Sequence, residues 1–234
     1  MQPGGEQGRF AQRFQHQYFD DTNLIKNMIF DLDVPTIGAI PGPGFHWDSA
    51  MLCDVTICTE DTKMEVPHAQ GGLVPGDGMG LMAQHYFGTK RGNYYTMTTR
   101  QFTAQQMLDW GMVSEVVPKG KAVERAWEIA RMWKTMPYEN RTIMSNLAKR
   151  PLKKLLVDDL KLHTVSEQYG SLLRIAAGDM GQLGRSLHGV GSIVAAEGGV
   201  EHPAVVDDVG HAGCLAVGSA VGVRSALSRT WSPS

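Results

Sequence analysis

Apolar and polar positions in the first sixty residues predict a helical stripe followed by short buried strands. Apolar side chains recur at helical spacing over residues 14–32, and Pro35 ends that stripe. The apolar-rich runs at 36–40 and 55–58 predict two buried strands, with a short helix at 49–52 between them.

Turn and capping signals mark the middle of the chain. Segments 41–44 and 71–78 are rich in glycine and proline, so each predicts a sharply turning loop. A helix is predicted over 103–110, because its first residue is a threonine typical of an N-cap and Gly111 follows its end. A strand is expected over 112–117.

Three amphipathic helices are predicted after that strand, over 121–134, 138–149 and 152–175. Pro137 and Pro151 are expected to separate them, because proline ends or kinks a helix. Short strands that lead into helices, followed by a helical C-terminal region, imply a layered α/β fold.

Composition changes sharply near residue 176. From Ala176 to Ser234 the chain has no lysine, phenylalanine or tyrosine, yet it holds 11 of the 27 glycines. So few large apolar side chains do not offset the entropy lost on ordering, which predicts a disordered tail. A reading frame shifted from the ancestral one would explain the same composition.

The expected organisation has four parts. An N-terminal extension at 1–19 precedes an α/β core at 20–136 and a helical region at 137–175. A Gly/Ala/Val-rich tail at 176–234 follows, to which the sequence assigns no chemistry.

Overall composition excludes several classes of protein. The chain has 234 residues, 42% of them hydrophobic, and a net charge of −2, which argues against nucleic-acid and anionic-membrane partners. No apolar run is long enough to span a membrane, and the first residues lack the pattern of a signal peptide. Cys53, Cys58 and Cys214 suggest neither a disulfide framework nor a metal cluster, so a reducing, cytoplasmic location is expected.

Four titratable residues lie in or beside the two turning loops: His46, Asp48, His68 and Asp77. If the second loop brings Asp77 to His68, the carboxylate would fix the imidazole tautomer and make the other ring nitrogen a better base. The alternative is a surface histidine and a turn aspartate, and spacing alone favours that alternative.

Other chemistry finds less support in the sequence. The remaining histidines show no spacing typical of zinc ligands, so no metal site is predicted. The run 76–80 lacks the lysine of a phosphate-binding loop, and Ser49 lacks the glycines of a nucleophile elbow.

Several segments carry a resemblance to a known family. They are Asp33–Gly42, Ala50–Asp54, Glu65–His68 (where that family usually has Phe-x-x-Pro-Glu), Gly72–Gly78 (Gly-x-x-Pro-x-x-Gly), Thr103–Met107 and Gly111–Val117. Together, over residues 20–175, they resemble the crotonase (enoyl-CoA hydratase/isomerase) superfamily. The resemblance implies a crotonase-like (ClpP/crotonase) spiral α/β fold, incomplete at its N-terminus because members carry about 80 more residues before the first helix.

One departure from the family points to a branch of it. Hydratases add water with two glutamates, but here the corresponding positions hold Asp48 and His68. The sequence Pro67-His68, the run 74–78 and Arg91-Gly92-Asn93-Tyr94 resemble the β-diketone hydrolase branch, typified by 6-oxocamphor hydrolase. With this resemblance the His68–Asp77 pair becomes the favoured interpretation.

The resemblance implies cofactor-independent retro-Claisen cleavage of a C–C bond between two carbonyls. His68, oriented by Asp77, would activate water, and His46 would stabilise the oxyanion or enolate together with the backbone N–H near Phe45. Glu167 would position water or relay a proton, or would be only a solvated helix residue. Substrate-binding roles are expected for Phe45, Trp47 and Asp48.

Two other functions stay open at this point. One is an enzyme acting on an acyl-CoA thioester, and the other is a non-catalytic, truncated family member. The resemblance further implies a homo-trimer or hexamer, with apolar residues of the last helix (Leu155, Leu156, Leu160, Leu162) packing against a neighbour or the core.

Overall fold

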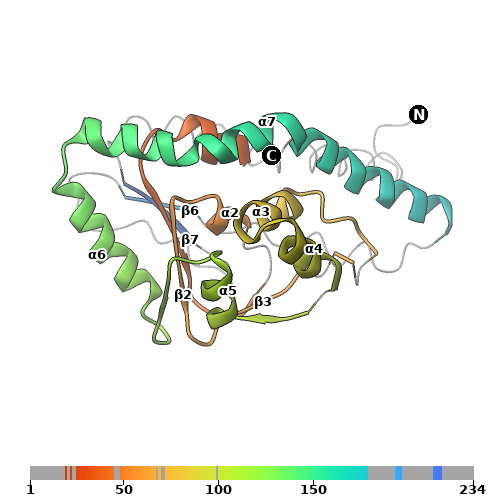
Figure 1. Ribbon diagram of the computed structural model, residues 1–234, viewed down its shortest axis with the longest axis horizontal. Coiled ribbons are helices and arrows are strands. Elements are labelled where there is room, and N and C mark those ends of the chain that lie inside the picture. Colours follow the sequence, from red (N-terminus) through yellow and green to blue (C-terminus); the bar gives the residue numbers. More distant parts are fainter. Residues whose placement is uncertain are drawn as a thin grey trace, which may run out of the picture.

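A computed structural model describes Phe19, Thr22, residues 25–44, 48–66, 68–69, 72–98 and 100–178, and two later strands at 193–196 and 213–217. For Asp48, Ser49 and those two strands it describes the backbone alone. Its central feature is a five-stranded sheet in the order β5-β2-β1-β7-β6 (Figure 1).

Three strands of this sheet follow the sequence predictions. β1 (Thr36–Ile40) and β2 (Val55–Thr59) are parallel, with Ile37 opposite Val55, and β2 is parallel to β5 (Glu115–Val117). The strands expected at 36–40 and 55–58 are thus confirmed. The third is shorter than expected, because Met112 and Val113 pack into the core before the strand begins.

Side chains alternate between the two faces of the sheet, as the period of two in a strand requires. Ile37, Ala39 and Ile57 pack against α6 (Ala122–Lys134). Ile40 and Cys58 belong to the larger core cluster on the other face. The site described below is built on the side of the sheet that bears this larger cluster.

The larger cluster is covered by short helices, which Figure 1 shows together beside the sheet. They are α2 (Asp48–Met51), α3 (Met79–Phe87), α4 (Thr89–Thr98) and α5 (Ala104–Trp110), joined by a two-stranded sheet of β3 (Lys63–Met64) and β4 (Phe102–Thr103). Thr103 caps α5 in a reciprocal capping box with Gln106, and Gly111 ends it in the left-handed conformation. The capping prediction is therefore confirmed.

The N-terminal stripe folds differently from the predicted α-helix. Its described part contains a π-helical turn, η1 (Asn27–Asp31), followed by extended backbone at Leu32. Ile25, Met28 and Ile29 of the stripe are buried in the core, so the predicted apolar face is confirmed. Residues 14–18 of that stripe lie outside the described part.

The C-terminal helices predicted at 138–149 and 152–175 are one helix, α7 (Tyr138–Ala176), with Pro151 inside it. Figure 1 shows α7 running along the length of the molecule, at its upper edge. The expected break at Pro151 is wrong because buried Lys149 and Leu152 hold the helix to the core on both sides of the proline. Such packing offsets the backbone hydrogen bond that proline removes.

Two strands lie in the segment expected to be disordered. β6 (Ile193–Ala196) is parallel to β7 (Gly213–Val217), and β7 is antiparallel to β1. These two strands differ from the expected disorder. β2 pairs with only one edge of β1, so the backbone N–H and C=O groups of the other edge of β1 are available to pair with β7. The rest of residues 179–234 lies outside the described part.

Cysteine chemistry differs between the two cysteines whose side chains are described. Cys53 is disulfide-bonded, although the spacing of the cysteines suggested no disulfide framework. Cys58 is a free thiol, and burial raises its pKa to about 11, which makes it unreactive at neutral pH.

Among the helices in the described part, none combines the length and apolar character needed to cross a bilayer.

Candidate active site

His68 and Asp77 meet in the interior. Nε2 of His68 lies 3.2 Å from Oδ2 of Asp77, and the two side chains are only 4% and 7% exposed. The alternative of a surface histidine beside a turn aspartate is therefore wrong. With Nε2 directed at the carboxylate, Nδ1 is the basic nitrogen of the neutral ring.

Asp77 is held in place by the start of α3. Its Oδ1 accepts a hydrogen bond from the backbone N–H of Met79 at 3.1 Å. Gly78 lies between them with a φ of 97°, a left-handed conformation that favours glycine. This short turn leaves one carboxylate oxygen for the helix terminus and directs the other at His68.

Glu167 joins the pair from α7. It is 5% exposed. A ring nitrogen of His68 and one carboxylate oxygen each of Asp77 and Glu167 all lie within 4.8 Å of one another. The alternative of a solvated helix residue is wrong for this glutamate. These three residues, here called the buried triad, come from three separate segments of the chain.

Close packing of α7 on the second loop creates the buried triad. A Cβ at Gly76 would overlap the carbonyl oxygen of His163 and would lie 2.5 Å from Cβ of Glu167. The absence of a side chain at Gly76 thus lets the loop that carries Asp77 touch the turn of α7 that carries Glu167.

Gly76→Ala is expected to lower the melting temperature by several degrees, since its methyl group meets backbone that moves only with the whole helix. Overpacking of this kind costs about 1–3 kcal/mol, and each kcal/mol corresponds to about 2–4 °C in a chain of this size. Thermal unfolding followed by circular dichroism measures the change. The matched control is Gly42→Ala, where nothing lies within 4 Å of the new Cβ; equal melting temperatures for the two variants would contradict the close approach.

The remaining predicted site residues are described only in part. Phe45, His46 and Trp47 lie outside the described residues, and Asp48 is the first residue of α2 with its backbone alone described. Their roles stay predictions.

Within the described part of the chain, the buried triad is also a group that could bind a metal ion, with one ligand atom from each residue. Sequence spacing did not suggest this group, because its members are far apart along the chain.

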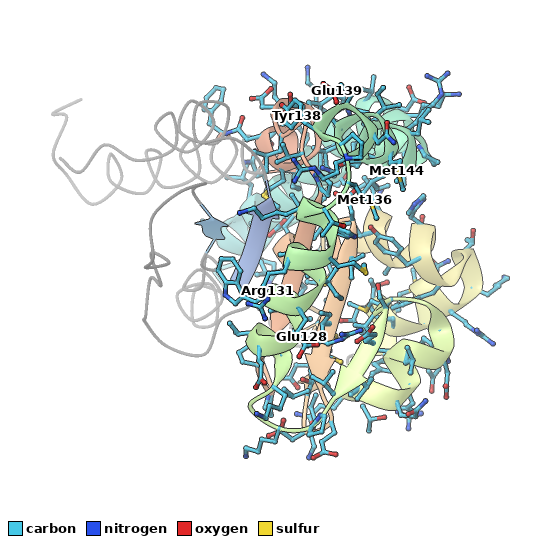
Figure 2. The ribbon with its side chains drawn as sticks, turned by 90° about the vertical axis from the view of Figure 1, so that its left-hand side faces the viewer. Glu128, Arg131, Met136, Tyr138, Glu139 and Met144 are labelled. Atoms are coloured by element: carbon cyan, nitrogen blue, oxygen red, sulfur yellow. The ribbon has the colours of Figure 1, made fainter. Side chains whose placement is uncertain are left out.

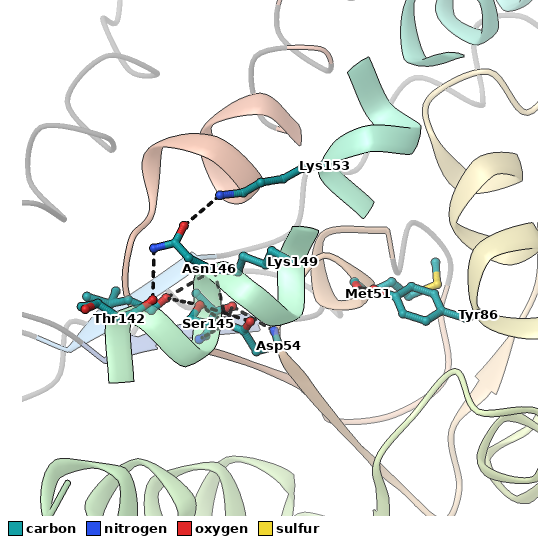
Figure 3. Close-up of polar contacts among 10 residues, drawn as sticks. Met51, Asp54, Tyr86, Thr142, Ser145, Asn146, Lys149 and Lys153 are labelled. Atoms are coloured by element: carbon teal, nitrogen blue, oxygen red, sulfur yellow. Dashed lines mark hydrogen bonds and ion pairs between the residues drawn. The ribbon is translucent and has the colours of Figure 1, made fainter. Parts of the chain in front are cut away.

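A second buried polar cluster fixes the other half of α7 to the sheet (Figure 3). Asp54 accepts hydrogen bonds at 2.8 to 3.0 Å from the N–H and hydroxyl of Thr36 and from the hydroxyl of Ser145. Nζ of Lys149 lies 3.3 Å from the same carboxylate oxygen and also donates to the carbonyl of Val34. Burial lowers the pKa of Lys149, and Asp54 opposes that shift.

An apolar pocket lies where α6 meets α7, at the corner marked by Met136, Tyr138 and Met144 in Figure 2. Its lining residues are Pro35, Asp54, Trp133, Met136, Arg141, Met144, Ser145 and Ala148. Ser145 and Glu167 are about 33 Å apart along α7 at 1.5 Å per residue, so this pocket is separate from the buried triad.

Residues 3–168 match the enoyl-CoA hydratase/isomerase family, a span that covers more than half of the chain. The chain therefore belongs to the enoyl-CoA hydratase/isomerase family. This confirms the resemblance to the crotonase superfamily and the α/β fold that it implied.

Proteins with different activities resemble this chain. Carnitinyl-CoA dehydratase of Salmonella typhi is 34% identical over 105 residues, which cover 44% of this chain and 40% of the relative. A β-diketone hydrolase from the cyanobacterium Anabaena, solved with (S)-3-oxocyclohexyl acetic acid bound, is 30% identical with a TM-score of 0.65. That match covers 69% of this chain and 65% of the hydrolase.

The fold is shared more widely within the family. An enoyl-CoA hydratase/isomerase from Mycobacterium paratuberculosis has a TM-score of 0.52 at 21% identity, over 55% of this chain and 52% of that one. The chain spans less than half the length of the carnitinyl-CoA dehydratase and about two thirds of the hydrolase.

Proposed function

We propose that this enoyl-CoA hydratase/isomerase family member is a hydrolase that cleaves a C–C bond of a 1,3-diketone. The observation that carries the proposal is the buried contact between His68 and Asp77, with Glu167 beside it. An imidazole oriented by a carboxylate is a suitable general base for water at neutral pH.

The proposed reaction begins when Nδ1 of His68 takes a proton from water. The water oxygen bonds to one carbonyl carbon and forms a tetrahedral alkoxide. When this intermediate collapses, the C–C bond to the central carbon breaks and its electron pair forms an enolate with the second carbonyl. The enolate carbon then takes the proton from His68, which leaves a carboxylic acid and a ketone without any cofactor.

Other residues are assigned supporting roles in this proposal. His46 and the backbone N–H of Phe45 would stabilise the oxyanion or enolate, an interaction worth about 3 kcal/mol. Trp47 and Asp48 would contact the substrate, and Glu167 would position the attacking water or relay a proton.

The molecule bound to the Anabaena hydrolase supports this choice of substrate class. By its name it is a ring ketone that bears a carboxylic acid arm. Hydrolysis of a 1,3-diketone that bridges a ring gives such a keto acid, because the attacked carbonyl becomes the carboxyl group. A bicyclic 1,3-diketone is therefore the first substrate to test.

An acyl-CoA thioester is the competing substrate, and the carnitinyl-CoA dehydratase relatives favour it. Against hydration stands His68 at the position where the resemblance places the second glutamate. A non-catalytic family member is the remaining alternative, consistent with the short span of this chain relative to its relatives.

One assay separates these three functions. The purified chain is incubated with a bicyclic 1,3-diketone or an enoyl-CoA, each with and without a chelator, and loss of substrate absorbance is followed. We expect diketone cleavage that the chelator does not change. Turnover of enoyl-CoA alone would establish the acyl-CoA function. Loss of diketone cleavage with chelator would show that cleavage requires a metal ion, and no turnover of either substrate would contradict both catalytic functions.

We propose further that the chain assembles as a homo-trimer or hexamer. Leu156 and Leu160 of α7 are buried in the chain's own core, but Val157, Leu162 and Tyr169 are at least 62% exposed. Association would cover such apolar side chains. Light scattering at micromolar concentration is expected to give the mass of three or six chains, and a monomer would contradict this.

A further inference from the structure

His163 lies on α7 one turn before Glu167 and contacts the segment that carries Asp77. A Cβ added at Gly76 would overlap the carbonyl oxygen of His163, so the two backbones pack closely together. A Cβ added at Gly80, in the first turn of α3, would lie 3.6 Å from the ring atoms Cε1 and Nδ1 of His163. The imidazole thus lies beside the start of α3, on the side of α7 that faces the buried triad.

Exposure distinguishes His163 from the triad. The side chains of His68, Asp77 and Glu167 are all more than nine-tenths buried, whereas His163 is only partly buried. Side chains four residues apart on a helix are neighbours, so His163 and Glu167 lie next to each other. His163 therefore lies between the buried triad and solvent.

The charges around His163 suit a group that takes up and releases protons. Burial lowers its pKa, and the carboxylates of Asp159 on α7 and Asp77 on the loop oppose that shift. Glu167 is the next acidic residue along the same side of α7. The first turn of α3, against which the ring packs, contributes no charged side chain.

The proposed reaction creates a need for such a group. The carboxylic acid product ionises at neutral pH, so each turnover releases one proton. When the acid ionises before it leaves, this proton passes to a site whose three titratable residues are almost fully buried. A buried site needs a path by which this proton reaches water.

We propose that His163 carries this proton between the buried triad and solvent. The neutral ring takes the proton at one nitrogen and passes it to water or buffer, which restores the neutral ring without any change of oxidation state. This assignment rests on the proposed function, because diketone hydrolysis is the reaction that releases the proton.

The kinetic test compares His163→Gln with His85→Gln. His85 is a matched control, since it is an exposed histidine on α3 whose ring contacts Tyr86. With a diketone in dilute buffer, His163→Gln is expected to lower kcat at least about tenfold with little change in KM. Added imidazole buffer should restore kcat in a saturable way, whereas His85→Gln should match the wild type at all buffer concentrations.

Two kinetic outcomes would overturn the proposal. Full activity of His163→Gln in dilute buffer would show that the proton leaves by another route. A loss of activity that buffer does not restore would show that His163 has only a structural role.

A substrate-free measurement separates failure of this proposal from failure of the proposed function. In an NMR titration of the histidine rings, Asp77→Asn should lower the pKa of His163, because it removes a carboxylate that favours the charged ring, and should leave His85 unchanged. An unchanged pKa of His163 would overturn the proposal whatever the substrate. Absence of diketone cleavage in the wild type would instead refute the proposed function.

Discussion

His68→Ala is expected to abolish cleavage of a 1,3-diketone, because it removes the base that activates water. His68 is buried and touches Asp77 at 3.2 Å, so no solvent-exposed group can substitute at the same position. Asp77→Asn is expected to lower kcat at least about a hundredfold, since the amide no longer orients and stabilises the ring as it gains a proton. Steady-state loss of diketone absorbance measures both effects.

The double variant His68→Ala/Asp77→Asn tests whether the two residues act together. If His68 and Asp77 act as one unit, their combined loss should be close to that of His68→Ala alone. His85→Ala on α3 is the control for replacing a histidine. Near wild-type cleavage by His68→Ala, or multiplication of the two single effects, would show that the pair is not the base.

Asp54→Ala is expected to destabilise the fold more strongly than Gly76→Ala does. It removes the common acceptor of Thr36, Ser145 and Lys149, all of which are buried. Removing one partner of a buried ion pair typically costs about 3–5 kcal/mol of unfolding free energy, which corresponds to a fall in melting temperature on the order of 10 °C. Asp158→Ala, at an exposed position of the same helix, should have little effect.

The pH dependence of Asp54→Ala gives a second measurement. Burial already lowers the pKa of Lys149, and loss of Asp54 removes a charge that opposes this shift. In the variant the pKa of Lys149 in the folded state therefore lies further below its value in the unfolded state. Over this wider pH range the unfolded state binds more protons than the folded state. Stability should rise with pH through that range, more steeply than in the wild type.

Chemical denaturation from pH 7 to 10, with Asp54→Ala/Lys149→Met alongside, tests this explanation. The double variant should regain part of the lost stability and lose the extra slope, because no unpaired ammonium is left in the interior. If Asp54→Ala unfolds at the same denaturant concentration as Asp158→Ala, the cluster does not hold α7 to the sheet.

The Asp54 cluster and the buried triad depend on the same helix. Lys149 and Glu167 are about 27 Å apart along α7 at 1.5 Å per residue. One end of the helix is fixed to β1 by buried polar groups, and the other supplies a carboxylate to the candidate active site. Because α7 continues through Pro151, Lys149 and Glu167 belong to one rigid helix.

Local signals in the sequence determined several elements directly. The strands at 36–40 and 55–58 follow from their apolar runs, and the helix after Thr103 follows from its cap and its terminal glycine. Such features form because the interactions that decide them lie within a few residues of one another. The resemblance to the crotonase superfamily, carried by short motifs, likewise came from the sequence and pointed to His68, Asp77 and Glu167 as site residues.

Only the tertiary structure decided whether those three residues meet. Spacing alone favoured a surface histidine, but packing of α7 on Gly76 brings His68, Asp77 and Glu167 together in the interior. The same packing places His163 beside the site, although its spacing from other histidines carried no signal. Contacts on both sides of Pro151 likewise keep α7 continuous against the local preference for a break. In each case long-range burial outweighs local preference, because it gains contacts that no short segment of the sequence encodes.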